Sequence, residues 1–484
     1  MLFNSYAFIF LFLPLTLLVY FLLGKARLTL ASRAWLVCAS LFYYAWWNPA
    51  YLPLILASIM FNYAVGTGLG RLGKPEIGKE NLRKIIFLAG IIANVALLGY
   101  YKYTDFMITN LNFLTDSQVQ LLKIVLPLGI SFFTFTQIAY LVDVYRHEAK
   151  EYDLLNYILF VTFFPHLIAG PIIHHKEMMP QFAAIRNKLF NYRHFFPGLF
   201  LFSIGLFKKV MVADTFAVWA NHGFASPNPL TGLEAWAASL SYTLQLYFDF
   251  SGYTDMALGS SLMFNIKLPI NFNSPYQALD IREFWHRWHI TLSRFLRDYV
   301  YIPLGGNRRG PHRTYVNLMA TFLIGGIWHG AGWTFVFWGF IHAMAMVVQR
   351  IWHSMGRNLP KVLAWFLTFN FVNVAWVFFR ARDWGEAANV LQGMCFLNGA
   401  GFPSLEQILA WNVKFRLFLK NIQGTNNTIW YILLALAVCF FCRNSNEMVK
   451  DFKPNWKYAM FGAALLVYSL INIDKASVFL YYNF

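Results

Sequence analysis

The sequence has little charge for its length. Asp, Glu, Lys and Arg make up 13% of its 484 residues, whereas hydrophobic residues make up 58%. Soluble domains carry about 25% charged residues, so much of this surface must face something other than water. No polar linker or low-complexity stretch divides the chain, which predicts one membrane domain over residues 1–484 in place of several soluble domains.

Acidic residues and cysteines are also scarce. The chain has 22 acidic and 39 basic residues, which gives a net charge of +17. The basic residues are dispersed among loops between apolar runs, so we expect them to contact anionic lipid headgroups and expect no nucleic-acid partner. The four cysteines are scattered, and Cys439 and Cys442 have no second pair or histidines nearby. No metal site is therefore predicted.

Long uncharged runs recur along the whole chain. A helix needs about 20 apolar residues to cross a hydrocarbon core of roughly 30 Å, and backbone polar groups in lipid must be satisfied within the segment. The runs therefore predict an all-α, polytopic transmembrane fold with about 11–12 spanning helices. They are Met1–Gly24, Ala34–Gly70, Ile85–Tyr101, Ile124–Val142, Leu154–His175, Ala235–Phe248, Thr314–Gln349, Val362–Phe379, Asn421–Cys442 and Tyr458–Ile473.

An ionisable ring interrupts one of these runs. His329 lies inside the uncharged run Thr314–Gln349, in the sequence GGIWHGAG. Ionisable groups at membrane depth are costly and are functional candidates by default, and histidine suits acid–base work near neutral pH. A histidine that hydrogen-bonds to a neighbouring helix would also satisfy the ring. The residues alone leave both interpretations open.

The segment Arg282–Arg313 is rich in arginine and tryptophan. It holds seven arginines against two acidic residues. Arg287, Arg294 and Arg297, interleaved with tryptophans, suit the binding of an anionic ligand. The alternative is an interfacial amphipathic helix that lies on anionic lipid.

Two carboxylates lie in another apolar stretch. Asp249 and Asp255 are six residues apart, a spacing that indicates no metal site or glycosidase pair. Because buried charges must be paired, we expect them to bind the arginines of the segment Arg282–Arg313 and to be structural.

A set of ordered motifs resembles the membrane-bound O-acyltransferase (MBOAT) family, and best of all its bacterial alginate O-acetyltransferase (AlgI-like) branch. The motifs extend to about residue 385, and residues 386–484 are less specific. His286 departs from the arginine expected there in this branch. The motifs are YYAWW (43–47), LPLGISF (126–132), FPHLIAGP (164–171), YFDFSG (247–252), EFWHRWH (283–289), Ser293, LRDY (296–299), LGGN (304–307) and GGIWHG (325–330).

The resemblance implies a fold, an activity and a site. The fold is a ring of tilted helices with re-entrant and interfacial helices. His329 matches the catalytic histidine of the family, and His289 matches the second histidine of the active region. The residues implied to bind substrate lie beside them in the motifs: Arg287, Trp288, Arg294, Arg297, Asn307 and Trp328.

The implied reaction moves an acyl group, most simply acetyl, from a cytoplasmic thioester such as acetyl-CoA. No tightly bound cofactor is expected. The acceptor is an exported polysaccharide such as alginate, reached through a periplasmic or membrane-anchored O-acetyltransferase partner with a serine nucleophile. The resemblance thus places the chain in the bacterial inner membrane as a multi-pass protein.

Several alternatives stay open at this point. His329 could serve as general base or carry the acyl group itself. A D-alanyl transferase of the teichoic acid type shares the implied fold. A transporter or a non-enzymatic scaffold of polysaccharide export would also be polytopic, but transporters typically show inverted repeats, whereas the Trp-His motifs occur only in the second half of this chain.

The distribution of Lys and Arg predicts the topology. Residues 25–33, 71–84 and 282–313 are basic, so the positive-inside rule places them in the cytoplasm and the N-terminus outside. Cysteines introduced at Lys79 and Arg309 should be labelled by a membrane-impermeant thiol reagent only after the cells are opened. Labelling of both positions in intact cells would contradict this topology.

Overall fold

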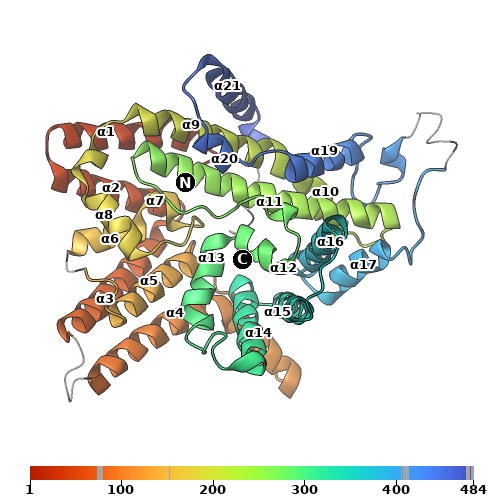
Figure 1. The fold of residues 1–484 in the computed structure, drawn as a ribbon, viewed down its shortest axis with the longest axis horizontal. Helices are drawn as coiled ribbons and strands as arrows, with labels where there is room; N and C mark the ends of the chain where they lie inside the picture. The colour runs from red at the N-terminus through yellow and green to blue at the C-terminus, as the bar shows by residue number, and fades with distance from the viewer. Residues whose placement is uncertain (74–79, 152, 405, 407–413, 476–479, 481–484) are drawn as a thin grey trace. The chain divides into compact units, whose positions relative to one another are not determined.

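The computed structural model divides the chain into two compact units. Unit 1 comprises Met1–Leu206, Tyr253–Ile270 and Phe452–Leu465, and unit 2 comprises Phe207–Gly252, Asn271–Asp451 and Leu466–Phe484. The structure describes all residues except 74–79, 152, 405, 407–413, 476–479 and 481–484 (Figure 1). Lys74 and Lys79 of the basic segment 71–84 therefore lie outside the described residues.

The described residues form helices and contain no β-strand. Six helical segments among them are long and apolar enough to cross a membrane: Ala7–Lys25, Pro49–Arg71, Glu80–Thr115, Tyr192–Phe224, Trp333–Ser354 and Lys361–Arg380. Three shorter apolar helices are Ile130–Tyr145, Thr428–Phe441 and Trp456–Ile471. The all-α polytopic membrane fold is confirmed, whereas the number of 11–12 crossings stays a prediction.

Unit 1 is built mainly from the first half of the chain. Its helices are α1 (Leu13–Lys25), α2 (Thr29–Ala45), α3 (Leu52–Arg71), α4 (Glu80–Thr115), α5 (Ile130–Tyr145), α6 (Leu154–Thr162), α7 (Phe164–Leu167), α8 (His175–Ala183) and most of α9 (Tyr192–Phe207). Asn62 of α3 and Asn94 of α4 exchange two amide hydrogen bonds of 3.1 and 2.7 Å. Such polar pairs hold helices together where lipid removes the hydrophobic driving force.

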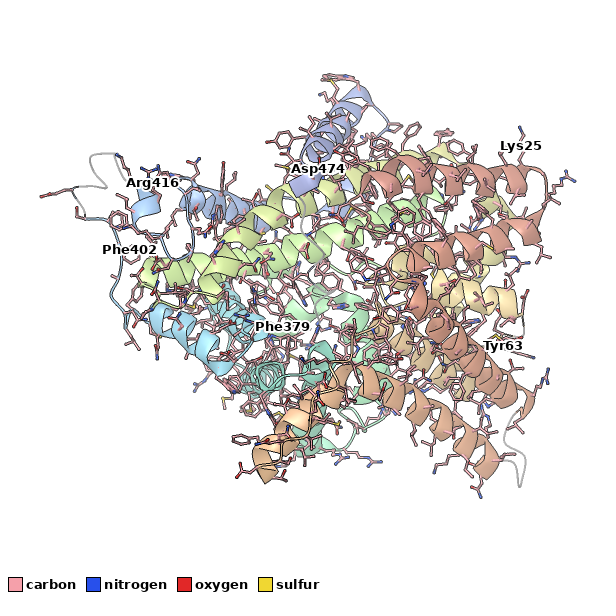
Figure 2. The ribbon with its side chains drawn as sticks, turned by 180° about the vertical axis from the view of Figure 1, so that it is seen from behind. Lys25, Tyr63, Phe379, Phe402, Arg416 and Asp474 are labelled. Atoms are coloured by element: carbon pink, nitrogen blue, oxygen red, sulfur yellow. The ribbon has the colours of Figure 1, made fainter. Side chains whose placement is uncertain are left out.

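Unit 2 contains the motifs with the two histidines. Its helices are α10 (Asp214–Phe224), the first part of α11 (Gly232–Met263), α12 (Ile281–Arg287), α13 (Ile290–Leu296), α14 (Gly310–His329), α15 (Trp333–Ser354), α16 (Lys361–Arg380), α17 (Trp384–Met394), α19 (Thr428–Phe441) and α20 (Ser445–Lys450). The end of α11 lies in unit 1, and α21 (Trp456–Ile471) also crosses from unit 1 into unit 2. Figure 2 labels Tyr63 of α3 in unit 1 and Phe379 of α16 in unit 2.

Two glycines bring α14 and α15 into close contact. A Cβ at Gly339 would lie 2.5 Å from the carbonyl oxygen of Phe322, and one at Gly326 would lie 2.5 Å from that of Phe335. Neither position has room for a side chain, so the two backbones touch as in other small-residue crossings. The crossing lies three residues before His329, the last residue of α14.

Backbone contacts fix the turn between α12 and α13. The Asp280 side chain caps α12 by accepting a hydrogen bond of 2.7 Å from the Glu283 N–H. His289 then adopts a left-handed conformation with φ of 42°, which turns the chain sharply before α13. Asn271 holds the start of α13 in place. Its backbone carbonyl accepts a hydrogen bond from Ile290 N–H at 3.0 Å, and its side-chain oxygen accepts one from Thr291 Oγ1 at 2.6 Å.

Asp249 does not pair with an arginine, so this expectation was wrong. Its Oδ1 lies 2.7 Å from Nζ of Lys209, which also lies 2.7 Å from Oδ1 of Asp214. All three side chains are buried or nearly so. A lysine forty residues earlier in the chain thus supplies the charge that the sequence pattern assigned to the arginine segment. The expected pairing of Asp255 stays a prediction.

The crossing of α14 and α15 predicts a strong effect of one methyl group. Gly339→Ala should lower stability by about 1–3 kcal/mol, the usual cost of overpacking, because the new Cβ meets a backbone carbonyl. Thermal unfolding in detergent measures it. Gly68→Ala is the matched control, since a Cβ at Gly68 in α3 meets no atom within 4 Å and alanine favours a helix. Equal melting temperatures for the two variants would contradict the prediction.

Candidate active site

His329 ends α14 with its imidazole among aromatic rings. The residue is 4% exposed, and its ring centroid lies 4.9 Å from that of Trp328, 5.2 Å from Trp338 and 5.1 Å from Phe379. All three contacts are edge-to-face, a favourable arrangement for aromatic pairs. Two tryptophans and a phenylalanine thus cover much of the ring and limit the ways in which another molecule can reach it.

A cavity of about 660 Å³ reaches His329 from the side of α12, α13 and α15. It lies wholly within unit 2 and is lined by residues of these helices, of the π-helical turn η6 (Arg297–Tyr301) and of α14. Cavities of this size hold small-molecule ligands and cofactors. The cavity therefore gives a ligand access to an imidazole that is otherwise enclosed.

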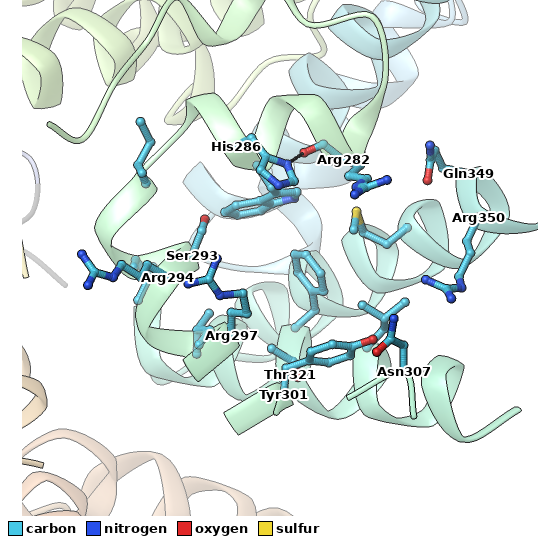
Figure 3. A pocket seen from close by; sticks show the side chains of 18 of the residues that line it. Arg282, His286, Ser293, Arg294, Arg297, Tyr301, Asn307, Thr321, Gln349 and Arg350 are labelled. Atoms are coloured by element: carbon cyan, nitrogen blue, oxygen red, sulfur yellow. Dashed lines mark hydrogen bonds between the residues drawn. The ribbon is translucent and has the colours of Figure 1, made fainter. Parts of the chain in front are cut away.

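One part of this cavity is strongly basic. Arg282, Arg294, Arg297 and Arg350 line it, and no acidic residue is among its described lining residues. In Figure 3, Arg294 and Arg297 lie on one side of the space, and Gln349 and Arg350 lie on the other. The guanidinium groups can therefore approach one anionic ligand from opposite sides, which suits phosphate recognition.

Asp298 contacts two of these arginines without lining the cavity. Its carboxylate lies 2.7 Å from Nε of Arg297 and 3.8 Å from Nε of Arg294. The hydrogen bond that Arg297 donates to the Asp298 carboxylate raises the pKa of Arg297, so this guanidinium stays charged at every physiological pH. Asp298 is thus shared between two guanidinium groups of the same wall.

His289 is buried on the other side of Trp328 and does not line the cavity. It is fully buried, with its ring centroid 4.8 Å from Phe250 and 6.4 Å from Trp328. Burial lowers the pKa of His289 to about 3, so its ring is neutral near pH 7. Neither ring nitrogen makes a hydrogen bond to any residue that the structure describes. His289 and His329 thus both pack against Trp328.

The cavity brings together four of the eight candidate site residues: Arg294, Arg297, Asn307 and His329. Arg287 instead donates a hydrogen bond of 2.8 Å to Glu283 and one of 3.1 Å to the Asn273 carbonyl. Trp288 is 1% exposed and lies against Trp376 at 4.9 Å. His289 and Trp328 lie behind the cavity, as described above.

Sequence reasoning missed the contribution of α15. Gln349, Arg350, His353 and Ser354 all line the cavity. Their pattern was visible, because residues three and four positions apart share one helix face and these polar residues follow directly on the uncharged run. Only the packing of α15 against α12 and α14 shows that this face meets the arginine segment.

The fold and the site define a polytopic membrane acyltransferase. The pattern of the family described as "MBOAT, membrane-bound O-acyltransferase family" matches residues 43–382. The chain belongs to this family, as the motifs predicted. The predicted O-acyltransferase activity is confirmed at this level.

Individual relatives agree with the family. The peptidoglycan O-acetyltransferase of Helicobacter pylori is 47% identical, over 100% of this chain and 98% of that protein. The probable alginate O-acetylase AlgI of Pseudomonas aeruginosa is 42% identical over 81% of this chain and 75% of its own. The teichoic acid D-alanyltransferase of Bacillus subtilis is 28% identical over 53% and 69%, respectively.

Proposed function

We propose that this protein transfers an acetyl group from a cytoplasmic thioester to a hydroxyl on the route to a polysaccharide of the cell envelope. The observation that carries the proposal is the cavity that joins four arginines to His329. An acyl-CoA has a matching structure, with an anionic nucleotide at one end and a small thioester at the other. Peptidoglycan is the favoured acceptor, because the relative with that activity is 47% identical along the whole chain, against 38% for the probable alginate O-acetylase AlgI of Pseudomonas putida.

His329 can act by either of two routes, and in the first it is the general base. The imidazole takes the proton of the incoming hydroxyl while the oxygen attacks the thioester carbonyl. The C–S bond then breaks, and the proton passes from the imidazolium to the leaving thiolate. Direct attack by His329 would give an acyl-imidazole that the hydroxyl then consumes; both routes need the same ring at the same place.

The acceptor hydroxyl can belong to the glycan or to a partner protein. A periplasmic or membrane-anchored O-acetyltransferase with a serine nucleophile would receive the acetyl group and pass it on. This arrangement places the protein in the bacterial inner membrane, with the arginine-lined part of the cavity toward the cytoplasm, as the positive-inside rule predicts.

The second candidate is transfer of D-alanine from a carrier protein. The similarity to the teichoic acid D-alanyltransferase of Bacillus subtilis favours it as a runner-up, but this match covers about half of the chain. Transfer from a purified carrier protein with none from acetyl-CoA would support this candidate.

Replacing His329 should abolish acetyl transfer. Loss of a general base typically costs a factor of about 10²–10⁴ in rate. His329→Gln is the sharpest variant, because an amide can keep a hydrogen bond but cannot serve as a base or nucleophile at neutral pH. Acetylation of the polysaccharide is measured at matched amounts of folded protein, with His289→Ala as a comparison that should lose less activity. Near-normal acetylation by His329→Gln would refute the catalytic role.

Removing a cavity arginine should weaken donor binding. Arg294→Gln should raise the KM for the thioester about tenfold, because one charge-assisted hydrogen bond contributes about 1.5–3 kcal/mol. The affinity of the purified variant should also fall less steeply as salt rises than that of the unmodified protein, because one attraction that salt screens has been removed. Arg357→Gln is the control, since Arg357 does not line the cavity and lies over the Trp352 ring at 5.9 Å. An unchanged KM for Arg294→Gln would favour a lipid-binding role for the arginine segment.

A further inference from the structure

A third buried histidine of unit 2, besides His289 and His329, lies behind the wall of the cavity. His342, in the middle of α15, is 0% exposed. Its ring is nearly parallel to those of Phe284 and Phe322, at centroid distances of 6.4 Å and interplanar angles of 15° and 14°. The imidazole is therefore packed against two phenyl rings, and it does not line the cavity.

His342 makes one directional contact, to a residue that does line the cavity. The indole Nε1–H of Trp285 donates a hydrogen bond of 3.3 Å to Nδ1 of His342. An indole nitrogen can only donate, so Nδ1 must present a lone pair and the proton of the neutral ring lies on Nε2. A phenylalanine at this position would fill a similar volume, but it would leave the buried indole N–H without its acceptor.

The same ring also supports the tryptophan that contacts His329. The centroid of His342 lies 4.7 Å from that of Trp338, and Trp338 lies 5.2 Å from His329 on its other side. Trp285 lies 5.8 Å from Trp338. Trp285, Trp338 and Phe322 all line the cavity, so a single imidazole touches three adjacent parts of its wall.

We propose that His342 is a positioning residue for acyl transfer. Its hydrogen bond fixes the rotation of the Trp285 indole, and its ring holds Trp338 against His329. Together these contacts set the shape of the cavity where the thioester must meet the catalytic imidazole. His342 itself does not touch the substrate. This inference rests on the proposed acetyl transfer, because a positioning role is defined only by the reaction that it serves.

The test removes the hydrogen-bond acceptor of residue 342 but keeps an aromatic ring of similar size there. His342→Phe should lower kcat about tenfold or more, since displacement of groups near the chemistry by about 1 Å can cost as much as 100-fold. The donor KM should change less than kcat, because the arginines lie elsewhere in the cavity. His342→Asn, whose side-chain oxygen can accept the indole hydrogen bond, should recover part of the lost turnover. A residue that only fills space would give the opposite order, with the phenylalanine variant more active than the asparagine variant.

A double-mutant cycle shows whether His342 acts through Trp285. Trp285→Phe removes the donor of the same hydrogen bond and should also lower kcat. If the two residues act as a pair, adding His342→Phe to Trp285→Phe should cost little more, because coupled residues are not additive. Full independence of the two effects would overturn the proposal. If His342→Phe does not fold, Trp285→Phe alone still tests the proposal. Full activity of Trp285→Phe would overturn the positioning role of His342.

A packing control separates positioning from general disturbance of the helix. Phe371 touches His342 at 5.3 Å but does not line the cavity, so Phe371→Leu should keep kcat even if its melting temperature falls. A loss of kcat in Phe371→Leu equal to that in His342→Phe would count against the specific role. Absence of acetyl transfer in the unmodified protein would refute the proposed function, whereas normal transfer by His342→Phe would refute only the positioning role.

Discussion

The site depends on the close contact between α14 and α15. Gly326 and Gly339 let the two backbones meet, three residues before α14 ends at His329. Because Trp338 is next to Gly339 in the sequence, the same contact brings the indole against the imidazole. One steric constraint thus favours the contact between His329 and Trp338.

Basic side chains in unit 2 occupy two kinds of place: one lies buried between carboxylates, and others line the cavity. Lys209 is buried between two aspartates, as a buried ion must be, since an unpaired one would cost several kcal/mol. The arginines around the cavity are placed differently: Arg294 and Arg297 share Asp298, and both also line the cavity. Lining a cavity distinguishes these arginines from the structural ion pair of Lys209.

The sequence predicted the features that depend on single residues and failed for those that depend on packing. His329 was identifiable because its ring lies in an uncharged run, is bracketed by glycines and matches the catalytic histidine of the family motif, whereas His342 in the same run has no such motif around it. Arg287 has another explanation within its own helix, because Glu283 precedes it by four residues and i,i+4 pairs of this kind form salt bridges. Arg350 and Lys209 could not be assigned, since their roles follow from which helices pack together across long stretches of chain.

The three buried histidines of unit 2 differ in position, and the proposed function gives each a different task. His329 lines the cavity, and the two tryptophans beside it are each backed by another buried histidine: Trp328 by His289 and Trp338 by His342. A catalytic imidazole must be accessible on one side and immobile on the others. Large aromatic side chains provide the immobility, because they have few rotatable bonds and pack over wide areas. A histidine behind these side chains adds hydrogen-bonding capacity to an otherwise apolar layer, as the bond from Trp285 to His342 shows. A directional hydrogen bond can fix the orientation of an aromatic ring, which apolar packing alone specifies less well.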